Sequence, residues 1–288
     1  MNQSFQTIAR LVLSGIAITS QILTQPHALS ADNANPSHRG ITAHRGNSGM
    51  FPENTLPAFE NAIELGVDWI ELDLFLTKDQ QLVVIHDQTT ERTGNRALDV
   101  TKSTLQEIQS VDVANDFRNR HKLSISDCPP QHVPQLEDVL NLVMRQNRTR
   151  VSIQPKVDCV AKAVEVIQKM GAENLVGFND GNLKLMIKAK QLAPDATIFW
   201  DRGVNTNINE DIQTATQYRF HALIYQDQGI SLEKINRTKM AGLNVGAWTV
   251  NDPDRIRELL RMGVNRIYTD YPQRMIKIIQ EENRPERL

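Results

Sequence analysis

Two histidines and a pair of carboxylates are the residues of this chain best suited to chemistry. His44 and His86 lie on either side of Glu71 and Asp73, which are separated by a single residue. In a β-strand, residues two apart project from the same face, so these carboxylates point the same way. Placed like this, they can supply hard oxygen ligands to a divalent cation. A cation, two histidines and the adjacent Arg45 form a set suited to phosphoryl transfer.

The segment from Asp73 to His86 predicts a β-hairpin that brings one histidine to the carboxylates. Asp79–Gln80 is a suitable two-residue turn between two apolar runs. A hairpin centred there pairs Leu76 with Val83 and, further along the ladder, Asp73 with His86. Directly opposed residues have Cβ atoms about 4.5–5.5 Å apart, so this register would place His86 beside Asp73.

Eight short motifs follow one another in order over nearly all of the chain after residue 40. They are His44–Gly46, Pro52–Thr55, Glu71–Asp73, Leu76–Asp79, Val83–Asp87, Val133–Leu140, Ala247–Asn251 and Gly263–Pro272. Each motif alone is weak, but the ordered set strongly resembles the glycerophosphodiester phosphodiesterase family. The resemblance implies a phosphoric diester hydrolase that converts glycerophosphodiesters to sn-glycerol 3-phosphate and an alcohol. It also implies a divalent cation, Ca²⁺ or Mg²⁺.

The resemblance assigns roles to the histidines and their neighbours. It makes His44 and His86 the catalytic acid and base, without indicating which is which. It makes Glu71 and Asp73 metal ligands and gives Arg45 the substrate phosphate, to which a guanidinium can make two parallel hydrogen bonds. The reference pKa of histidine, about 6.5, allows one copy to give a proton and the other to accept one near neutrality.

Further residues take supporting roles by the same resemblance. Lys156 is expected to bind the phosphate together with Arg45, and Trp248 to line the substrate pocket. Glu53 is expected to support the site from behind by orienting a histidine.

Two positions depart from the family pattern. Gln154 stands where the family usually has a third acidic ligand, in an acid-x-Lys pattern with Lys156. Its amide oxygen can still coordinate a cation, so we expect Gln154 to be a metal ligand that holds the ion more weakly or favours Ca²⁺. Gln80 stands where the family often has glycine. Because residues other than glycine seldom adopt a positive φ, a different turn there would shift the hairpin register.

From residue 40 onward, predicted strands alternate with amphipathic helices, as is typical of a parallel sheet covered by helices. Eight such units predict an α/β fold, a (β/α)8 TIM barrel with a β-hairpin replacing the helix directly after the second strand. The stretch Gln88–Gln131 is predicted to be a loop with one short helix, Thr104–Ser110. The predicted strands are Gly40–Arg45, Trp69–Phe75, Arg150–Pro155, Leu175–Phe178, Thr197–Trp200, Ala222–Gln226, Val245–Val250 and Arg266–Thr269, with Leu82–His86 as the return strand of the hairpin. The other predicted helices are Leu56–Glu64, Leu136–Arg145, Cys159–Met170, Leu183–Gln191, Asn209–Tyr218, Leu232–Ala241 and Pro253–Met262.

The first thirty residues have the pattern of a secretory signal peptide. Arg10 precedes a short apolar core, Leu11–Ile18, and Ala28–Ser30 is a small-x-small cleavage site. The domain order predicted is a signal peptide over 1–30, a linker over 31–39, the barrel over 40–280 and a frayed end over 281–288. We expect a periplasmic or secreted protein without stable membrane insertion after cleavage. An uncleaved anchor is the alternative, although the apolar core is shorter than the roughly 20 residues of a membrane span.

Composition narrows the partners. The chain has 32 Lys and Arg against 34 Asp and Glu, and cleavage removes Arg10 alone, leaving 31 against 34, a net charge of −3. Such a balance argues against nucleic acid and against strong attraction to anionic membranes. The family resemblance implies a small-molecule glycerophosphodiester as the partner. Neither observation indicates an oligomeric state. The two cysteines, Cys128 and Cys159, permit a disulfide in an exported protein, with two independent thiols as the alternative.

Two other functions stay open at this point. A lysophospholipase D or sphingomyelinase D on a similar barrel would need an apolar channel for an acyl chain, and Gln88–Gln131 shows no obvious apolar insertion. A barrel that binds phosphodiesters without turning them over is the second alternative, because Gln154 lacks the charge of the usual acid. The sequence does not reveal which alcohol the substrate carries.

Overall fold

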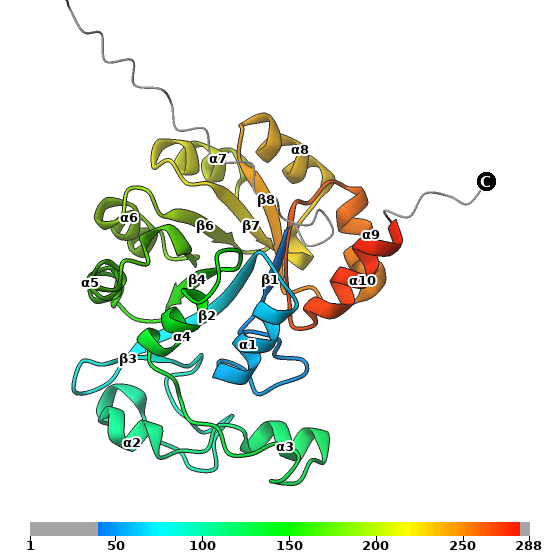
Figure 1. The fold of residues 1–288 in the computed structure, drawn as a ribbon. Coiled ribbons are helices and arrows are strands. Elements are labelled where there is room, and N and C mark those ends of the chain that lie inside the picture. The colour runs from blue at the N-terminus through cyan, green and yellow to red at the C-terminus, as the bar shows by residue number, and fades with distance from the viewer. Residues whose placement is uncertain (1–39, 283–288) are drawn as a thin grey trace, which may run out of the picture. The chain divides into compact units, whose positions relative to one another are not determined.

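The computed structural model describes residues 40–282, and these residues form a closed parallel barrel with helices outside it (Figure 1). The barrel strands follow the order β1-β9-β8-β7-β6-β5-β4-β2, and β1 pairs with β2 to close the ring. Their bounds are β1 (Ile41–Ala43), β2 (Trp69–Leu76), β4 (Arg150–Pro155), β5 (Val176–Asp180), β6 (Thr197–Arg202), β7 (Ala222–Gln226), β8 (Asn244–Trp248) and β9 (Arg266–Thr269). The predicted (β/α)8 barrel is confirmed. The signal peptide and linker predicted over residues 1–39, and residues 283–288, lie outside the described part.

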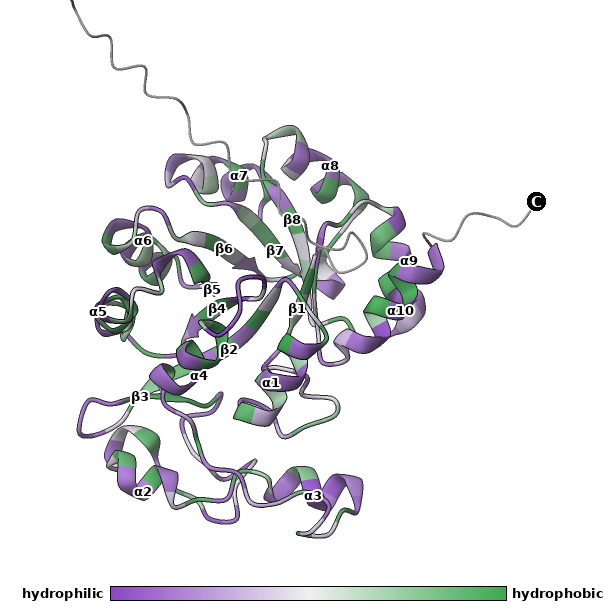
Figure 2. Cartoon of the chain, viewed as in Figure 1, coloured by the Kyte–Doolittle hydropathy of each residue, from purple (hydrophilic) through white to green (hydrophobic). Residues whose placement is uncertain are grey.

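A helix follows each barrel strand along the chain, and these helices cover the outside of the barrel. They are α1 (Leu56–Glu64), α4 (Leu136–Val143), α5 (Val160–Met170), α6 (Leu183–Leu192), α7 (Ile208–Gln217), α8 (Leu232–Met240), α9 (Pro253–Arg261) and α10 (Pro272–Glu282). Figure 2 shows hydrophobic and hydrophilic residues side by side on these outer helices, as expected where one face packs on the sheet. The helix α10, which follows β9, was missed in the sequence. No helix within residues 40–282 is long and apolar enough to cross a membrane.

Alternation along the strands separates the core from the site. On β2, Ile70, Leu72 and Leu74 face the helix layer and are fully buried in the main hydrophobic cluster. The intervening residues, among them Glu71 and Asp73, therefore face the inside of the barrel. The same alternation on each strand gives the barrel an apolar outer surface under the helices and a polar upper interior.

Aromatic rings fill the lower interior of the barrel beneath the polar residues. The rings of Trp69 and Phe199 meet edge to face with their centroids 5.0 Å apart. The guanidinium of Arg266 lies 4.6 Å from the Phe199 centroid and donates a hydrogen bond to Thr42 at 2.8 Å. This packed floor means that a ligand can enter the barrel only from the other end, where the strands finish.

The hairpin after β2 is present, but its register differs from the prediction by one residue. Strand β3 (Leu82–Val84) pairs Leu76 with Leu82 and Phe75 with Val83, so Asp73 faces Ile85 instead of His86. The cause is the turn, which is a three-residue loop over residues 78–80. Gln80 adopts φ 59°, the left-handed conformation that closes such a loop.

The connection between the hairpin and α4 holds more structure than one helix. A short 3-10 turn, η2 (Val100–Lys102), is followed by α2 (Leu105–Gln109) and α3 (Asn115–His121). The helix α2 matches the predicted one and begins with a capping box from Thr104. The helix α3 was not predicted, because Phe117 is its only apolar residue. Short 3-10 turns also precede β5 (η3, Glu173–Leu175) and follow β7 (η4, Asp227–Gly229).

The disulfide considered between Cys128 and Cys159 is not formed. Both cysteines are free thiols. Cys159 is buried at the start of α5, where its sulfur lies 3.8 Å from the backbone oxygen of Leu74 inside the main core. Cys128 belongs to the loop after α3, where its backbone oxygen accepts a hydrogen bond from Arg118. Burial raises the pKa of the Cys159 thiol to about 12, so it behaves as a small apolar residue.

Candidate active site

The predicted site residues gather at the C-terminal mouth of the barrel. His44 and Arg45 directly follow β1, Glu71 and Asp73 belong to the second half of β2, and Trp248 ends β8. Six of them line one cavity of about 250 Å³ together with Trp248: His44, Arg45, Glu71, His86, Gln154 and Lys156. Asp73 is fully buried behind that lining. Residues that are distant in the sequence thus share one small polar chamber.

The conformation of Arg45 is set by the carboxylates of β2. Its backbone is left-handed, with φ 55°, and its amide donates to Glu71 Oε2 at 3.0 Å. Its guanidinium lies 3.3 Å from Asp73 Oδ2 through Nε and donates to Glu53 Oε1 through Nη1 at 2.9 Å. Glu53 therefore holds an arginine, and the expectation that it orients a histidine was wrong. Asn54 donates to Asp73 Oδ2 at 2.8 Å, which gives this neighbour of Glu53 a positioning role that was not foreseen.

A carboxylate from the opposite end of the chain orients His44. Its Nδ1 lies 2.7 Å from Asp270 Oδ1, and Asp270 also accepts hydrogen bonds from Asn251 and Ser48. Burial would lower the pKa of His44, but the hydrogen bond to Asp270 and the charge of Glu71 outweigh it and raise this pKa above 6.5. Burial would raise the pKa of Asp270, but the hydrogen bond from His44 outweighs it and lowers this pKa to about 2. The pair favours a charged imidazole with Nε2 available for the cavity.

His86 also has a carboxylate at Nδ1, but its pKa is shifted in the opposite direction from that of His44. Its Nδ1 lies 2.6 Å from Asp87 Oδ1, and Asp87 is held by Arg92 at 2.5 Å. Burial lowers the pKa of His86, and Arg45 adds to that, although Asp73 opposes it. Arg92 also donates twice to Glu53, at 2.6 and 2.8 Å, and so ties the loop after the hairpin to the residues around β1. Neither Asp87 nor Arg92 had been assigned a role from the sequence.

The oxygen atoms around Asp73 fit a hard cation. The Lys156 ammonium lies 3.0 Å from Asp73 Oδ1 and also contacts Gln154 Oε1, so a positive group already bridges these two oxygens. Burial and Asp73 raise the pKa of Glu71 to about 7, whereas Lys156 and Arg45 outweigh burial and lower the pKa of Asp73. Within residues 40–282, no three His, Cys, Asp or Glu side chains are grouped as a metal cage. Two carboxylates and one amide suit Mg²⁺ or Ca²⁺ completed by water and substrate oxygens.

A chain of polar side chains continues across the inner wall on β4, β5 and β6. Ser152 Oγ donates to Asn179 Oδ1 at 2.7 Å, and Asn179 Nδ2 donates to Asp201 Oδ2 at 3.2 Å. Gln154 Nε2 donates to the same Asp201 oxygen at 3.3 Å. No role had been predicted for β5 and β6. The available signal was the alternation along the strands, because Asn179 and Asp201 lie on the same inward face as Ser152 and Gln154.

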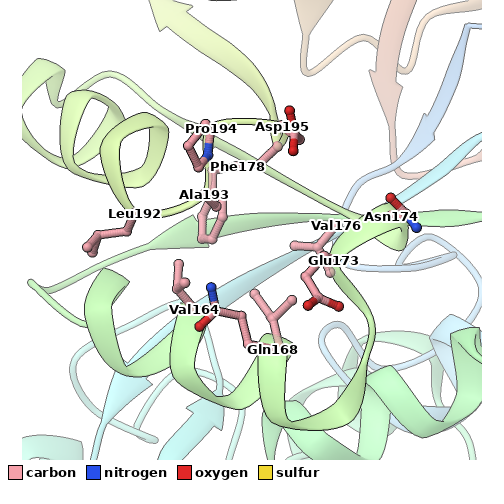
Figure 3. A pocket seen from close by; sticks show the side chains of 12 residues that line it. Val164, Gln168, Glu173, Asn174, Val176, Phe178, Leu192, Ala193, Pro194 and Asp195 are labelled. Atoms are coloured by element: carbon pink, nitrogen blue, oxygen red, sulfur yellow. The ribbon is translucent and has the colours of Figure 1, made fainter. Parts of the chain in front are cut away.

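A larger cavity than that of the predicted site lies at the other end of the barrel. It measures about 430 Å³ and is bounded by α5, α6 and the starts of β5 and β6, with Val164, Phe178 and Leu192 among its walls (Figure 3). None of the predicted site residues reaches it. In barrels of this kind, the N-terminal end is associated with stability, so size does not make this cavity the site.

The fold and its polar mouth place the protein among the TIM-barrel enzymes. The model of the glycerophosphoryl diester phosphodiesterase family matches residues 44–274, and the chain belongs to this family. It is 32% identical over 250 residues to a glycerophosphodiester phosphodiesterase of Bacillus altitudinis, covering 84% of this chain and 98% of the relative. A glycerophosphodiester phosphodiesterase of Caldanaerobacter subterraneus is 29% identical over 250 residues, with coverages of 84% and 98%.

The fold is also found in solved structures. One is a phosphodiesterase of Oleispira antarctica in complex with the product sn-glycerol-3-phosphate, with a TM-score of 0.74. It is 23% identical, and the match covers 83% of this chain and 96% of that one. Together with the family match, these likenesses identify an enzyme of the glycerophosphodiester phosphodiesterase class.

Proposed function

We propose that the protein hydrolyses glycerophosphodiesters to sn-glycerol 3-phosphate and an alcohol in a cation-dependent reaction that uses His44 and His86 as acid and base. One observation above all supports this. Both histidines line one cavity with Arg45, and each has a carboxylate on Nδ1 that leaves Nε2 for a substrate. The product named in the Oleispira antarctica complex is the phosphate ester that this reaction would release.

The pKa values of the two histidines are shifted in opposite directions, and these shifts suggest which is the acid and which is the base. His44, whose pKa is raised, is the general acid that protonates the leaving alcohol oxygen. His86, whose pKa is lowered, is the general base that takes the proton of the attacking hydroxyl, whether water or the 2-hydroxyl of glycerol. Pairs of titratable groups whose environments separate their pKa values commonly divide the work in this way.

The remaining charged residues hold the phosphate and the ion. Arg45 and Lys156 line the cavity and would bind the non-bridging oxygens of the substrate phosphate and offset the charge that develops there. Glu71, Asp73 and the amide oxygen of Gln154 would hold the cation. When bound, that ion would polarise the phosphoryl group as a Lewis acid.

A substrate panel tests this proposal. The protein is dialysed against a chelator and assayed with glycerophosphocholine, glycerophosphoethanolamine and lysophosphatidylcholine, alone and with Mg²⁺ or Ca²⁺ restored. We expect turnover of the two water-soluble diesters that falls at least tenfold without the ion and returns with it. Faster release of choline from lysophosphatidylcholine would favour the lysophospholipase D alternative. Binding of diesters without turnover under every condition would favour the non-catalytic barrel.

We also propose that the protein is exported and cleaved near Ser30, because residues 1–30 have the order of a signal peptide. Intact mass of the protein recovered outside the cytoplasm should then correspond to a chain beginning near Ala31. A full-length product that stays with the membrane fraction would show that the segment is an anchor.

A further inference from the structure

Asp201 is the residue of the cavity that the predicted machinery leaves unexplained. Its side chain enters the barrel from β6, it is 8% exposed, and it lines the cavity that contains both histidines. Two amides fix one of its oxygens, because Asn179 and Gln154 both donate to Oδ2. A carboxyl group held on one side by two donors presents its other oxygen in a fixed direction.

That other oxygen lacks a partner within residues 40–282. Asp201 Oδ1 is buried and makes no hydrogen bond there, and the same holds for Nε1 of Trp248, which lines the same cavity. Buried polar atoms are seldom left unpaired in proteins, because an unmade hydrogen bond destabilises the folded state. Exceptions of this kind in a cavity point to a polar ligand.

Two neighbouring cavities can each hold one half of a phosphodiester. The inner one is the cavity of about 250 Å³, bounded by the barrel wall and Asp201. The outer one measures about 340 Å³ and reaches Arg120 on α3 and Tyr271 before α10. His44 and Arg45 line both cavities, so a phosphate bound there would have one ester arm on each side. The inner cavity is enclosed and polar, so it suits the glycerol half that all these substrates share. The outer cavity is left for the alcohol, which varies between substrates.

We propose that Asp201 recognises the glycerol half of the substrate, with Oδ1 hydrogen-bonded to a glycerol hydroxyl in the inner cavity. The proposal rests on the proposed function and names a specificity-determining residue for it. A hydroxyl group both donates and accepts, so it pairs with the carboxyl group in either protonation state.

Substitutions at Asp201 separate recognition of glycerol from general damage. Asp201→Ala removes the partner of the hydroxyl. In Asp201→Asn, the amide oxygen can accept from Asn179 and Gln154, while the amide nitrogen still faces the cavity. Asp227→Ala is the matched control, because Asp227 follows β7 on the same rim and is ion-paired with Arg255 at 2.8 Å. Each variant is assayed with glycerophosphocholine and with bis(4-nitrophenyl) phosphate, a diester that has no hydroxyl.

We expect Asp201→Ala to lower kcat/KM for glycerophosphocholine about 10- to 100-fold and that for the aryl diester less than about threefold. Asp201→Asn should lose less on glycerophosphocholine than Asp201→Ala does, and Asp227→Ala should match the wild type on both substrates. Equal losses on both substrates would overturn the proposal, because Asp201 would then act on the phosphate, the ion or the fold. Unchanged kinetics on both would overturn it as well.

A binding measurement keeps this inference separate from the proposed function. Calorimetric titration with sn-glycerol 3-phosphate and with methyl phosphate measures the contribution of the glycerol hydroxyls without turnover. Wild type should bind sn-glycerol 3-phosphate at least tenfold more tightly than methyl phosphate, and Asp201→Ala should remove most of that difference. A difference that is absent in wild type, or intact in Asp201→Ala, would contradict the role of Asp201 even if the enzyme hydrolyses diesters. Absence of hydrolysis together with the expected binding would contradict the proposed function alone.

Discussion

The two sides of the barrel mouth are encoded in different ways. The side formed by β1, β2 and β9 carries its residues in short contiguous motifs, such as His44-Arg45 and Glu71-Leu72-Asp73. The wall formed by β4, β5 and β6 contributes Gln154, Asn179 and Asp201, at most one or two polar residues from each strand. Both sides nevertheless share one cavity. Chemistry that needs adjacent residues leaves a motif, whereas a surface that recognises a substrate can be built from single inward positions.

The histidines on the motif side should give the largest effects. His44→Ala and His86→Ala are each expected to lower kcat about 10²- to 10⁴-fold, because positioned acids and bases contribute that much. Both residues lie at the mouth of the barrel and are only partly buried, so the thermal midpoint should stay within a few degrees. Turnover and thermal unfolding are measured on the same preparations. Activity within threefold of wild type in either variant would remove that histidine from the mechanism.

Gln154 contacts both sides of the mouth, because its amide nitrogen donates to Asp201 and its amide oxygen contacts Lys156 beside Asp73. Its replacement tests whether a change on one side affects ion binding on the other. Gln154→Glu restores a carboxylate beside Asp73, but it also removes the donor to Asp201 and sets two carboxyl groups together. We therefore expect the double variant Gln154→Glu/Asp201→Asn to tighten Mg²⁺ or Ca²⁺ binding roughly tenfold, and Gln154→Glu alone to tighten it less. Calorimetry gives the dissociation constants. Unchanged affinity in both variants would place Gln154 outside the coordination of the ion.

Asp270 should control the pH dependence from the motif side. A general acid must be protonated, so activity should fall as pH rises through the pKa of His44, which Asp270 raises. A general base must be deprotonated, so activity should rise as pH increases through the lowered pKa of His86. Asp270→Asn removes the charge that favours the imidazolium and should move the alkaline limb of the kcat/KM profile to lower pH. If only the acidic limb moves, the two roles are exchanged.

The smallest effect should come from reduction of the cysteines. Cys159 lies behind the β4 wall and Cys128 in the connection after α3, and both are free thiols. A strong reductant should change the thermal midpoint by less than about 1 °C. A disulfide typically contributes about 2–4 kcal/mol, which would lower the midpoint by several degrees on reduction. A shift of that size would show a bridge that the structure does not contain.

The sequence predicted most of the fold, because strand and helix periodicities are local. The hairpin register was wrong by one residue, since Gln80 adopts a left-handed conformation that favours glycine. The helix α3 was missed, because its stability comes from packing of Phe117 and from ion pairs such as Arg120 with Asp116, and not from an apolar face.

The site was predictable only where neighbours in the sequence are neighbours in space. The contact of His44 with Asp270 joins residues 226 positions apart, and no local pattern predicts such a pair. Asn179 and Asp201 each precede a charged residue at the end of a strand, Asp180 and Arg202, and the sequence does not tell which of the two side chains is buried. The contact between Asn179 and Asp201 inside the barrel depends on strand register, which the closed ring fixes and a single sequence does not.

On the proposed function, both sides of the barrel mouth act on one substrate, which is cleaved into glycerol phosphate and a free alcohol. Phosphorus NMR of glycerophosphocholine hydrolysis tests this most directly, because the two P–O cleavages give different phosphate esters. We predict that the signal of sn-glycerol 3-phosphate grows with Mg²⁺ or Ca²⁺ present, and that it stays absent when a chelator is added. Accumulation of phosphocholine, or no conversion with either ion, would contradict the account.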